Sequence, residues 1–177
     1  MKKIIFCIVM IGILCFGREL NRNQIEVRGK IIYEKGKYEP YTGAIKEYHE
    51  NGKIRKEENY KNGKLEGIYR RYYESGQLEY ECNHKNNRLV GVSKQYYENG
   101  KLMAEQNYVF GKEESSKKEY YKNGALKEES VWKFKEKGST VERRHGLTKI
   151  YDENGRIFLE VKFKNGEVSG KVKDYTE

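Results

Sequence analysis

The feature that most constrains this chain is a repeat with a constant period. A motif seen in Lys94–Leu102 (KQYYENGKL) recurs along the chain, and its glycine returns three times at intervals of 24 residues and once at an interval of 31. A second glycine series keeps the same step, with Ser115 in one expected slot, so seven extra residues lie between Ser115 and Gly146. Self-similarity at such a period is the signature of a repeat architecture. The first series is Gly52, Gly76, Gly100, Gly124 and Gly155, and the second is Gly43, Gly67, Gly91, Gly146 and Gly170.

Each unit has the pattern of a β-hairpin. Two short β-prone runs, such as GIYRRYY from Gly67 and QLEYECNH from Gln77, alternate with glycine-containing turns. The first turn of most units is Asn-Gly, which favours the positive φ angles of a type I′ hairpin. Helix caps and a 3.6-residue apolar period are absent from the repeats. We therefore predict an all-β fold, an elongated antiparallel β-meander of tandem hairpin repeats with a 24-residue period.

Three columns of side chains recur in every complete unit. A tyrosine column and a basic column two residues earlier share one face of the first strand, because side chains alternate with a period of two. A glutamate column lies on the second strand, where it can pair with the basic column at roughly 0.2 to 1 kcal/mol per pair. The tyrosines are Tyr48, Tyr72, Tyr96, Tyr120 and Tyr151, the basic residues are Lys46, Arg70, Lys94, Lys118 and Lys149, and the glutamates are Glu57, Glu81, Glu105, Glu129 and Glu160.

The register of these hairpins has two solutions. A two-residue turn at 51–52 places Lys46 opposite Glu57, and its Asn-Gly chemistry favours this solution. A three-residue turn places Tyr48 opposite Ile54, which suits a core better but sets Lys46 against another lysine. A slip of one residue exchanges the two faces of a strand. The sequence leaves both registers open.

The first 17 residues resemble a secretory signal peptide. Lys2 and Lys3 precede an apolar run from Ile4 to Phe16, which is too short to span a bilayer, and small residues lead to a predicted cleavage after Gly17. A buried N-terminal strand and a lipoprotein acylated at Cys15 are the alternatives, the latter disfavoured by the bulky residue before Cys15. We predict a half repeat over residues 18–42, then five repeats and a final half repeat over 43–177, with an insertion near 134–145.

Composition restricts the chemistry that this chain can perform. Removing Lys2 and Lys3 with the signal peptide lowers the formal net charge from +9 to +7, and Cys82 becomes the single cysteine, so no intramolecular disulfide can form. The three histidines lack metal-ligand spacing and are expected to replace a tyrosine or fill a loop. No nucleophile elbow, P-loop or paired-carboxylate motif is present. We predict no catalytic residues, no metal site and no cofactor.

The repeat consensus GxxKxYYENGKLxxExxYxNGKLxG resembles the MORN-repeat variant family of bacteria, many of whose sequences are described as antitoxin-like. The resemblance covers about Gly43–Thr176 and implies stacked hairpins in an elongated antiparallel meander. It implies a scaffold for docking, and no particular reaction, because a fold alone does not define a function. An antitoxin role implies a cytosolic partner, against which the predicted signal peptide argues.

These patterns predict an exported, non-enzymatic β-repeat scaffold that docks another protein through its extended face. The candidate binding face is formed by the tyrosine and basic columns. In the competing interpretation, the tyrosines are buried as a core and the lysines form a solvated rim that is paired with the glutamates. A binding module for anionic envelope or membrane surfaces is the first alternative function, and a cytosolic antitoxin-like protein is the second; no nucleic-acid partner is expected. The insertion is a candidate docking loop through Lys135, Lys137, Arg143 and Arg144.

Overall fold

The computed structural model describes residues 19–108, 114–134 and 142–176. The predicted signal peptide, with its cleavage site after Gly17 and the alternative acylation site Cys15, lies outside the described residues, as do Lys135 and Lys137. Within the described ranges, the chain forms no helix that is long and apolar enough to cross a membrane.

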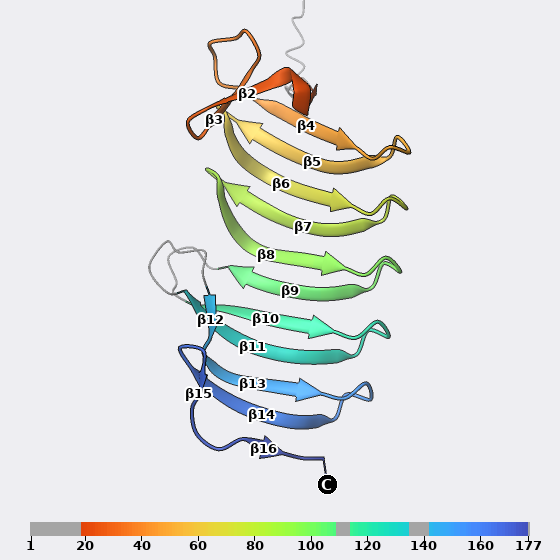
Figure 1. The fold of residues 1–177 in the computed structure, drawn as a ribbon, viewed down its shortest axis with the longest axis vertical. Coiled ribbons are helices and arrows are strands. Elements are labelled where there is room, and N and C mark those ends of the chain that lie inside the picture. The colour runs from red at the N-terminus through yellow and green to blue at the C-terminus, as the bar shows by residue number, and fades with distance from the viewer. Residues whose placement is uncertain (1–18, 109–113, 135–141, 177) are drawn as a thin grey trace, which may run out of the picture.

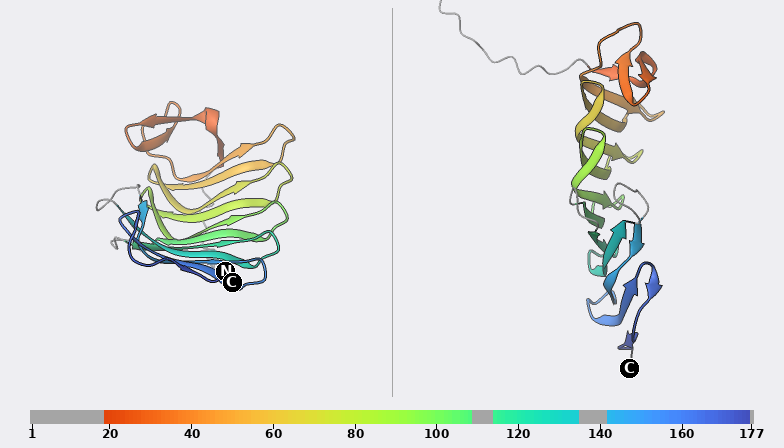
Figure 2. Two further views of the ribbon diagram at one scale, coloured as in Figure 1. Left: turned by 60° about the horizontal axis from the view of Figure 1, so that its bottom comes forward. Right: turned by 90° about the vertical axis from the view of Figure 1, so that its left-hand side faces the viewer.

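One long sheet contains most of the strands, and from β4 (Gly43–Tyr48) onward the chain runs through it as an antiparallel meander (Figure 1). The short strand at its N-terminal edge pairs in parallel with β4. Seen from its side, the sheet is a single layer (Figure 2). The strands of its path are β1 (Leu20–Asn21), β4 (Gly43–Tyr48), β5 (Ile54–Lys61), β6 (Lys64–Tyr72), β7 (Leu78–Lys85), β8 (Arg88–Tyr96), β9 (Leu102–Tyr108), β10 (Glu114–Tyr120), β11 (Leu126–Phe134), β13 (Gly146–Tyr151), β14 (Ile157–Lys164) and β15 (Glu167–Val168). Beside this path, β12 (Glu142–Arg144) pairs with β11 and β16 (Lys173–Asp174) pairs with β14. The predicted all-β meander of hairpins is confirmed.

The first turn of each unit combines the two registers that the sequence left open. Lys46 lies opposite Glu57, as a two-residue turn predicts, and Tyr48 lies opposite Ile54, as the rival register predicts. A β-bulge between Glu47 and Tyr48 accommodates both pairings, since it inserts one extra residue into the second strand. The bulge recurs in the later hairpins, and the assumption that the two registers exclude each other was therefore wrong.

The two turns of each unit differ in geometry. In the first turn the amide of Gly52 donates to the carbonyl of His49, and Gly52 has a φ of +80°, so a type I turn is followed by a left-handed glycine. The type I′ geometry predicted for this turn is wrong. It occurs in the second turn, where Asn62 and Gly63 both have positive φ, at 50° and 72°. The Asn-Gly dipeptide thus occurs in two turn types, the type I turn with a left-handed glycine and the type I′ turn, and the loop length selects between them.

The N-terminal segment forms a separate hairpin that covers one end of the sheet. A short 3₁₀ helix (Arg22–Gln24) leads into β2 (Ile25–Arg28) and β3 (Ile31–Glu34), which form a two-stranded sheet of their own. The hairpin is joined to the first repeat by a hydrogen bond from the Ile32 amide to the Gly63 carbonyl, at 2.9 Å. Residues 18–42 were expected to form half a repeat, and the structure instead shows a cap at the end of the array (Figure 2). Its hydrophobic cluster contains Leu20, Ile25, Ile32, Tyr41 and Ile45.

The repeats bury one face of the sheet more than the other, and we call it the packed face. An aromatic position near the end of each second strand lines this face, beside a partly polar row that includes Cys82, Ser93, Ser130 and Thr148, all buried. The tyrosine column lies on the opposite face, so the interpretation of these tyrosines as the core is wrong. The aromatic positions of the packed face are Tyr60, His84, Tyr108, Trp132 and Phe163.

Candidate functional site: the charged face

The face opposite the packed face carries an unbroken row of alternating charges across the sheet, and we call it the charged face. Each interior member lies opposite a residue of the other sign on both neighbouring strands, from β4 to β16. The structure therefore brings the predicted basic and glutamate columns together in one line. In order across the sheet, the row is Lys46, Glu57, Arg70, Glu81, Lys94, Glu105, Lys118, Glu129, Lys149, Glu160 and Lys173.

Ion pairs along the row neutralise its charges. Arg70 Nε lies 2.7 Å from Glu81 Oε2, and Lys149 Nζ lies 3.4 Å from Glu129 Oε1. At the N-terminal end Glu19 takes the place of a repeat glutamate, because its carboxylate accepts from Lys46 at 2.7 Å and from the Tyr48 hydroxyl at 3.2 Å. Hydrogen bonding to Lys46 lowers the pKa of Glu19. The row is thus a balanced lattice of charges with little excess of either sign.

The tyrosine column runs beside this row and is bonded to it. The Tyr120 hydroxyl donates to Glu105 at 3.1 Å, and the Tyr151 hydroxyl donates to Glu129 at 2.7 Å. Burial and the neighbouring carboxylates raise the pKa of both tyrosines to about 12. The same hydrogen bond is the main cause that lowers the pKa of Glu129. These tyrosines therefore hold the row in place while their rings stay half exposed.

A second set of aromatic hydroxyls joins successive first turns. The tyrosine that follows the column tyrosine in the second to fourth repeats donates to the carbonyl of the next column tyrosine, as Tyr73 does to Tyr96 at 2.7 Å and Tyr121 does to Tyr151 at 2.8 Å. His49 fills this position in the first repeat, with its Nε2 atom 2.9 Å from the Tyr72 carbonyl. The prediction that a histidine replaces a tyrosine is confirmed for His49. This ladder keeps the repeats in register along the whole edge.

The charged face also exposes apolar side chains that sequence reasoning missed. Ile68, Val92 and Leu147 are 41%, 45% and 45% exposed, and Tyr48 is 47% exposed. The first three follow the second-series glycines directly, so their offset from glycine was the signal that could have found them. Strand alternation places Ile68 and Val92 on the face of the charged row. A partner would therefore meet apolar contacts beside balanced charges.

The two described residues of the candidate docking loop, Arg143 and Arg144, have different surroundings. Arg143 and Arg144 belong to strand β12 and lie opposite Lys133 and Trp132 of β11. The Arg144 guanidinium lies 5.4 Å from the Trp132 ring centre and 3.0 Å from a Glu128 oxygen, so it packs within the molecule. It occupies the position that Leu65 and Leu89 hold two residues before the second-series glycine in the second and third repeats. Arg143 is exposed.

Other candidate chemistry is sparse. The described residues contain no cluster of three or more His, Cys, Asp or Glu side chains that could hold a metal ion. Cys82 is buried, and burial raises the pKa of its thiol, with His84 Nδ1 3.6 Å from Sγ. A buried thiol with a raised pKa is a poor nucleophile.

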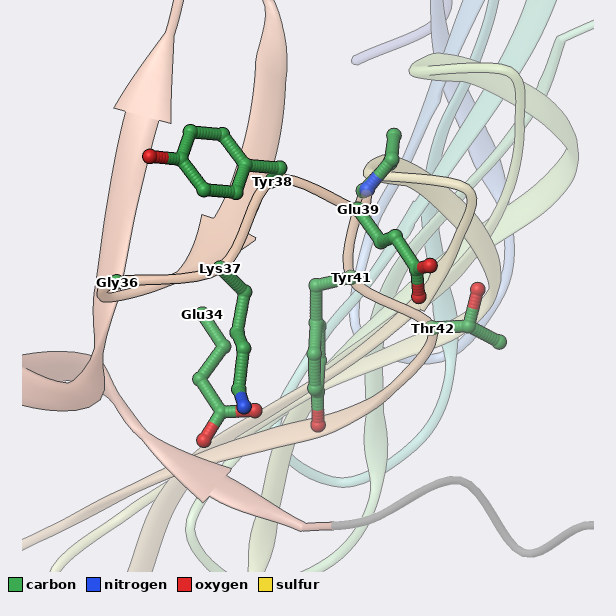
Figure 3. A pocket seen from close by; sticks show the side chains of 8 residues that line it. Glu34, Gly36, Lys37, Tyr38, Glu39, Tyr41 and Thr42 are labelled. Atoms are coloured by element: carbon green, nitrogen blue, oxygen red, sulfur yellow. The ribbon is translucent and has the colours of Figure 1, made fainter.

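A shallow pocket lies at the N-terminal cap, between β3 and β4 (Figure 3). Its volume is about 500 Å³, and its lining includes Glu34, Lys37, Tyr41 and Thr42. Figure 3 shows Glu34, Lys37 and Tyr41 pointing to one side of the loop, whereas Tyr38 points away from them. Tyr38 is 91% exposed, so the aromatic ring that could cover a ligand here does not enclose the pocket.

The fold and this face together define a β-repeat binding scaffold, in which similar hairpins present one long surface. A family model described as MORN repeat variant matches residues 41–62, 65–86, 89–109, 114–133 and 144–165, which is more than half of the chain. The chain therefore belongs to the MORN repeat variant family. A search of curated proteins finds no match.

Proposed function

We propose that this protein is an exported, non-enzymatic scaffold that docks a partner protein through the charged face. The observation that carries the proposal is the single-layer sheet, whose charged face is covered by no other described element and exposes Ile68, Val92 and Leu147. Exposed apolar side chains beside polar groups mark many protein interfaces. The alternation of charge suits such an interface. A partner whose charges follow the complementary order would be attracted, whereas a partner shifted by one strand would place like charges opposite each other.

Export is supported by the sequence, because Lys2 and Lys3, the apolar run from Ile4 to Phe16 and the small residue Gly17 have the pattern of a secretory signal peptide. Sequencing of the mature N-terminus tests this part: we expect Arg18 as the first residue, and an intact Met1 in the cytosol would instead support the antitoxin-like alternative.

The docking face is tested by placing charges on its apolar positions. We expect Ile68→Glu/Val92→Glu to abolish recovery of a stoichiometric partner that copurifies with the protein from its native culture. Val27→Glu/Val168→Glu is the matched control, since these two valines are also exposed but lie outside the charged face. Mass spectrometry of the purified material identifies the partner and measures its recovery. Equal loss of the partner in both variants would refute docking through the charged face.

A further inference from the structure

The first turns of the repeats follow one another along one edge of the sheet (Figure 1), and four of them contain Asn-Gly. Their backbones are alike, because each glycine has a positive φ and its amide donates to the carbonyl three residues before it. The asparagines are all exposed, so water reaches each of them. They differ in how their side chains are held. The four are Asn51, Asn99, Asn123 and Asn154.

Two hydrogen bonds hold the side chain in the first three of these turns. Asn51 Oδ1 accepts from the Lys53 amide at 3.0 Å, and Asn51 Nδ2 donates to the Glu74 carbonyl of the next first turn at 2.8 Å. Asn99 and Asn123 make the same two bonds, with Oδ1 distances of 3.0 and 2.8 Å and Nδ2 distances of 3.4 and 3.3 Å. Each carboxamide is thus fixed at both ends.

Asn154 makes neither of these bonds. In this repeat Asp152 stands in the place of a ladder tyrosine, and its Oδ1 atom accepts from the backbone amides of Arg156 at 2.8 Å and Asn154 at 2.9 Å. The Arg156 amide is the donor that bonds to the asparagine in the other turns. Its hydrogen bond is the main cause that lowers the pKa of Asp152, to which the Asn154 side chain also contributes. Among the described residues, Asn154 Nδ2 donates to no carbonyl of another first turn.

We infer that Asn154 is a site of spontaneous deamidation in the folded protein and that it reacts before the other three asparagines. The Gly155 backbone nitrogen loses its proton and attacks Asn154 Cγ, which forms a nitrogen–carbon bond. The Cγ–Nδ2 bond then breaks and ammonia leaves with a proton, so a five-membered succinimide remains. Water opens this ring at either carbonyl and yields aspartate or isoaspartate. Glycine favours the ring closure, because it has no Cβ beside the attacking nitrogen.

The two hydrogen bonds set the difference in rate. Ring closure requires the carboxamide to turn until Cγ meets the next backbone nitrogen, so a bond that fixes the carboxamide slows the reaction. One such bond changes an equilibrium constant by about fivefold. We therefore expect Asn154 to react at least about fivefold faster than the other three. Asn62 and Asn165 also precede glycine, but their φ angles of 50° and 55° belong to the second turns, which have a different backbone.

Conversion of Asn154 would change the hairpin formed by β13 and β14. Both products place a new negative charge near Asp152, and isoaspartate also adds a methylene group to the main chain of the turn. The same hairpin carries Lys149 and Glu160 of the charged row, which lie opposite each other. The inference concerns the chemistry of a turn and is independent of the proposed docking function.

Peptide mapping by mass spectrometry tests the inference on the purified protein, incubated at mildly alkaline pH. Trypsin places the four asparagines on separate peptides, because a lysine or arginine lies between each pair. We expect the mass change from amide to acid to accumulate first in the peptide that contains Asn154. The same incubation in urea is the control, since unfolding removes the hydrogen bonds and should bring the four rates close together.

Two variants test the role of Asp152. Asp152→Tyr restores the ladder tyrosine and leaves the Arg156 amide for Asn154 Oδ1, so deamidation at Asn154 should slow by about fivefold. Asp152→Asn keeps an Oδ1 acceptor without the charge and should leave the reaction fast. Thermal melts verify that both variants fold.

Three results would overturn the inference. The first is a rate at Asn154 that does not exceed those of the other three asparagines in the folded protein. The second is a lead of Asn154 that persists in urea, which would assign it to the local sequence alone. The third is an equal rate in the folded Asp152→Tyr variant and the unmodified protein. The comparison of folded and urea-treated protein decides the matter even if a variant fails to fold.

Discussion

The N-terminal cap and the repeats behind it are held together by different means. The cap buries an apolar cluster around Leu20, Ile25 and Ile45, the last of which is fully buried. Beyond the first repeat, the buried side chains of the described residues are mostly polar, such as Ser93, Ser130 and Thr148, and Cys82 and Val161 are the buried apolar exceptions.

This difference shows that a single-layer array depends on its strand ladders and on periodic side-chain contacts more than on a deep core. Each repeat buries little apolar surface by itself, so the stability of the array depends on the contacts between neighbouring repeats. The cap supplies the one end where apolar burial dominates. Substitutions should therefore lower the free energy of unfolding most in the cap and least along the charged face.

The largest effect is expected from Leu20→Ala. This substitution removes a buried side chain from the apolar cluster and should lower the free energy of unfolding by about 3 kcal/mol. Cys82→Ala, at a buried position within the repeats, should cost about 1 kcal/mol, because the removed atom is a single sulfur. Urea denaturation of both variants gives the comparison, and equal costs would contradict the distinction between cap and repeats.

Gly63→Ala should have the next largest effect, since this glycine joins the cap to the first repeat. An added Cβ would lie 2.3 Å from Ile31 Cγ2 and 2.8 Å from the Ile32 carbonyl oxygen. Gly91 has a similar positive φ, but a Cβ added there meets nothing within 4 Å. We expect Gly63→Ala to cost about 2 kcal/mol more than Gly91→Ala. Equal melting temperatures for the two variants would show that the cap does not pack against the turn at Gly63.

A smaller loss is expected from Tyr121→Phe in the tyrosine ladder. The variant keeps the ring but removes the hydroxyl that donates to the Tyr151 carbonyl, and it should cost about 1 kcal/mol. Tyr38→Phe is the control, since Tyr38 is exposed in the cap loop. Should both variants unfold at the same urea concentration as the unmodified protein, the ladder would contribute nothing to the stability of the array.

The smallest effect is a change in tyrosine titration. Tyr108 on the packed face and Tyr120 on the charged face both have a pKa of about 12, the first mainly through burial and the second through burial and the Glu105 hydrogen bond. Glu105→Gln should lower the pKa of Tyr120 and leave that of Tyr108 unchanged. Absorbance at alkaline pH measures both, with Tyr→Phe variants for assignment.

The sign of the accompanying stability change follows from linkage. These tyrosines bind their protons more tightly in the folded state than in the unfolded state, where the pKa is about 10. Stability should therefore be constant below about pH 10 and fall as the pH rises toward 12. Stability that rises over this interval would contradict the raised pKa values.

Periodicity predicted the hairpins and the three side-chain columns, because a strict repeat constrains every unit at once. It could not predict the bulge beside Tyr48, since each pairing alone satisfied one column and only a local insertion satisfies both. Arg144 was misplaced in the docking-loop interpretation, because its charge suggested exposure although its offset from Gly146 matches a packed leucine position. The cap was not foreseen either, since residues 25–34 carry the pattern of a repeat strand but form a separate two-stranded sheet.

The most direct test of docking through the charged face is site-specific photo-crosslinking from strand β8. A photoreactive residue at Val92 projects from the charged face, whereas the same residue at Gln95 projects from the packed face of the same strand. We predict that position 92 yields one predominant covalent adduct with the partner in the native culture and that position 95 yields little or none. Equal adducts from both positions, or an adduct from position 95 alone, would contradict docking through the charged face.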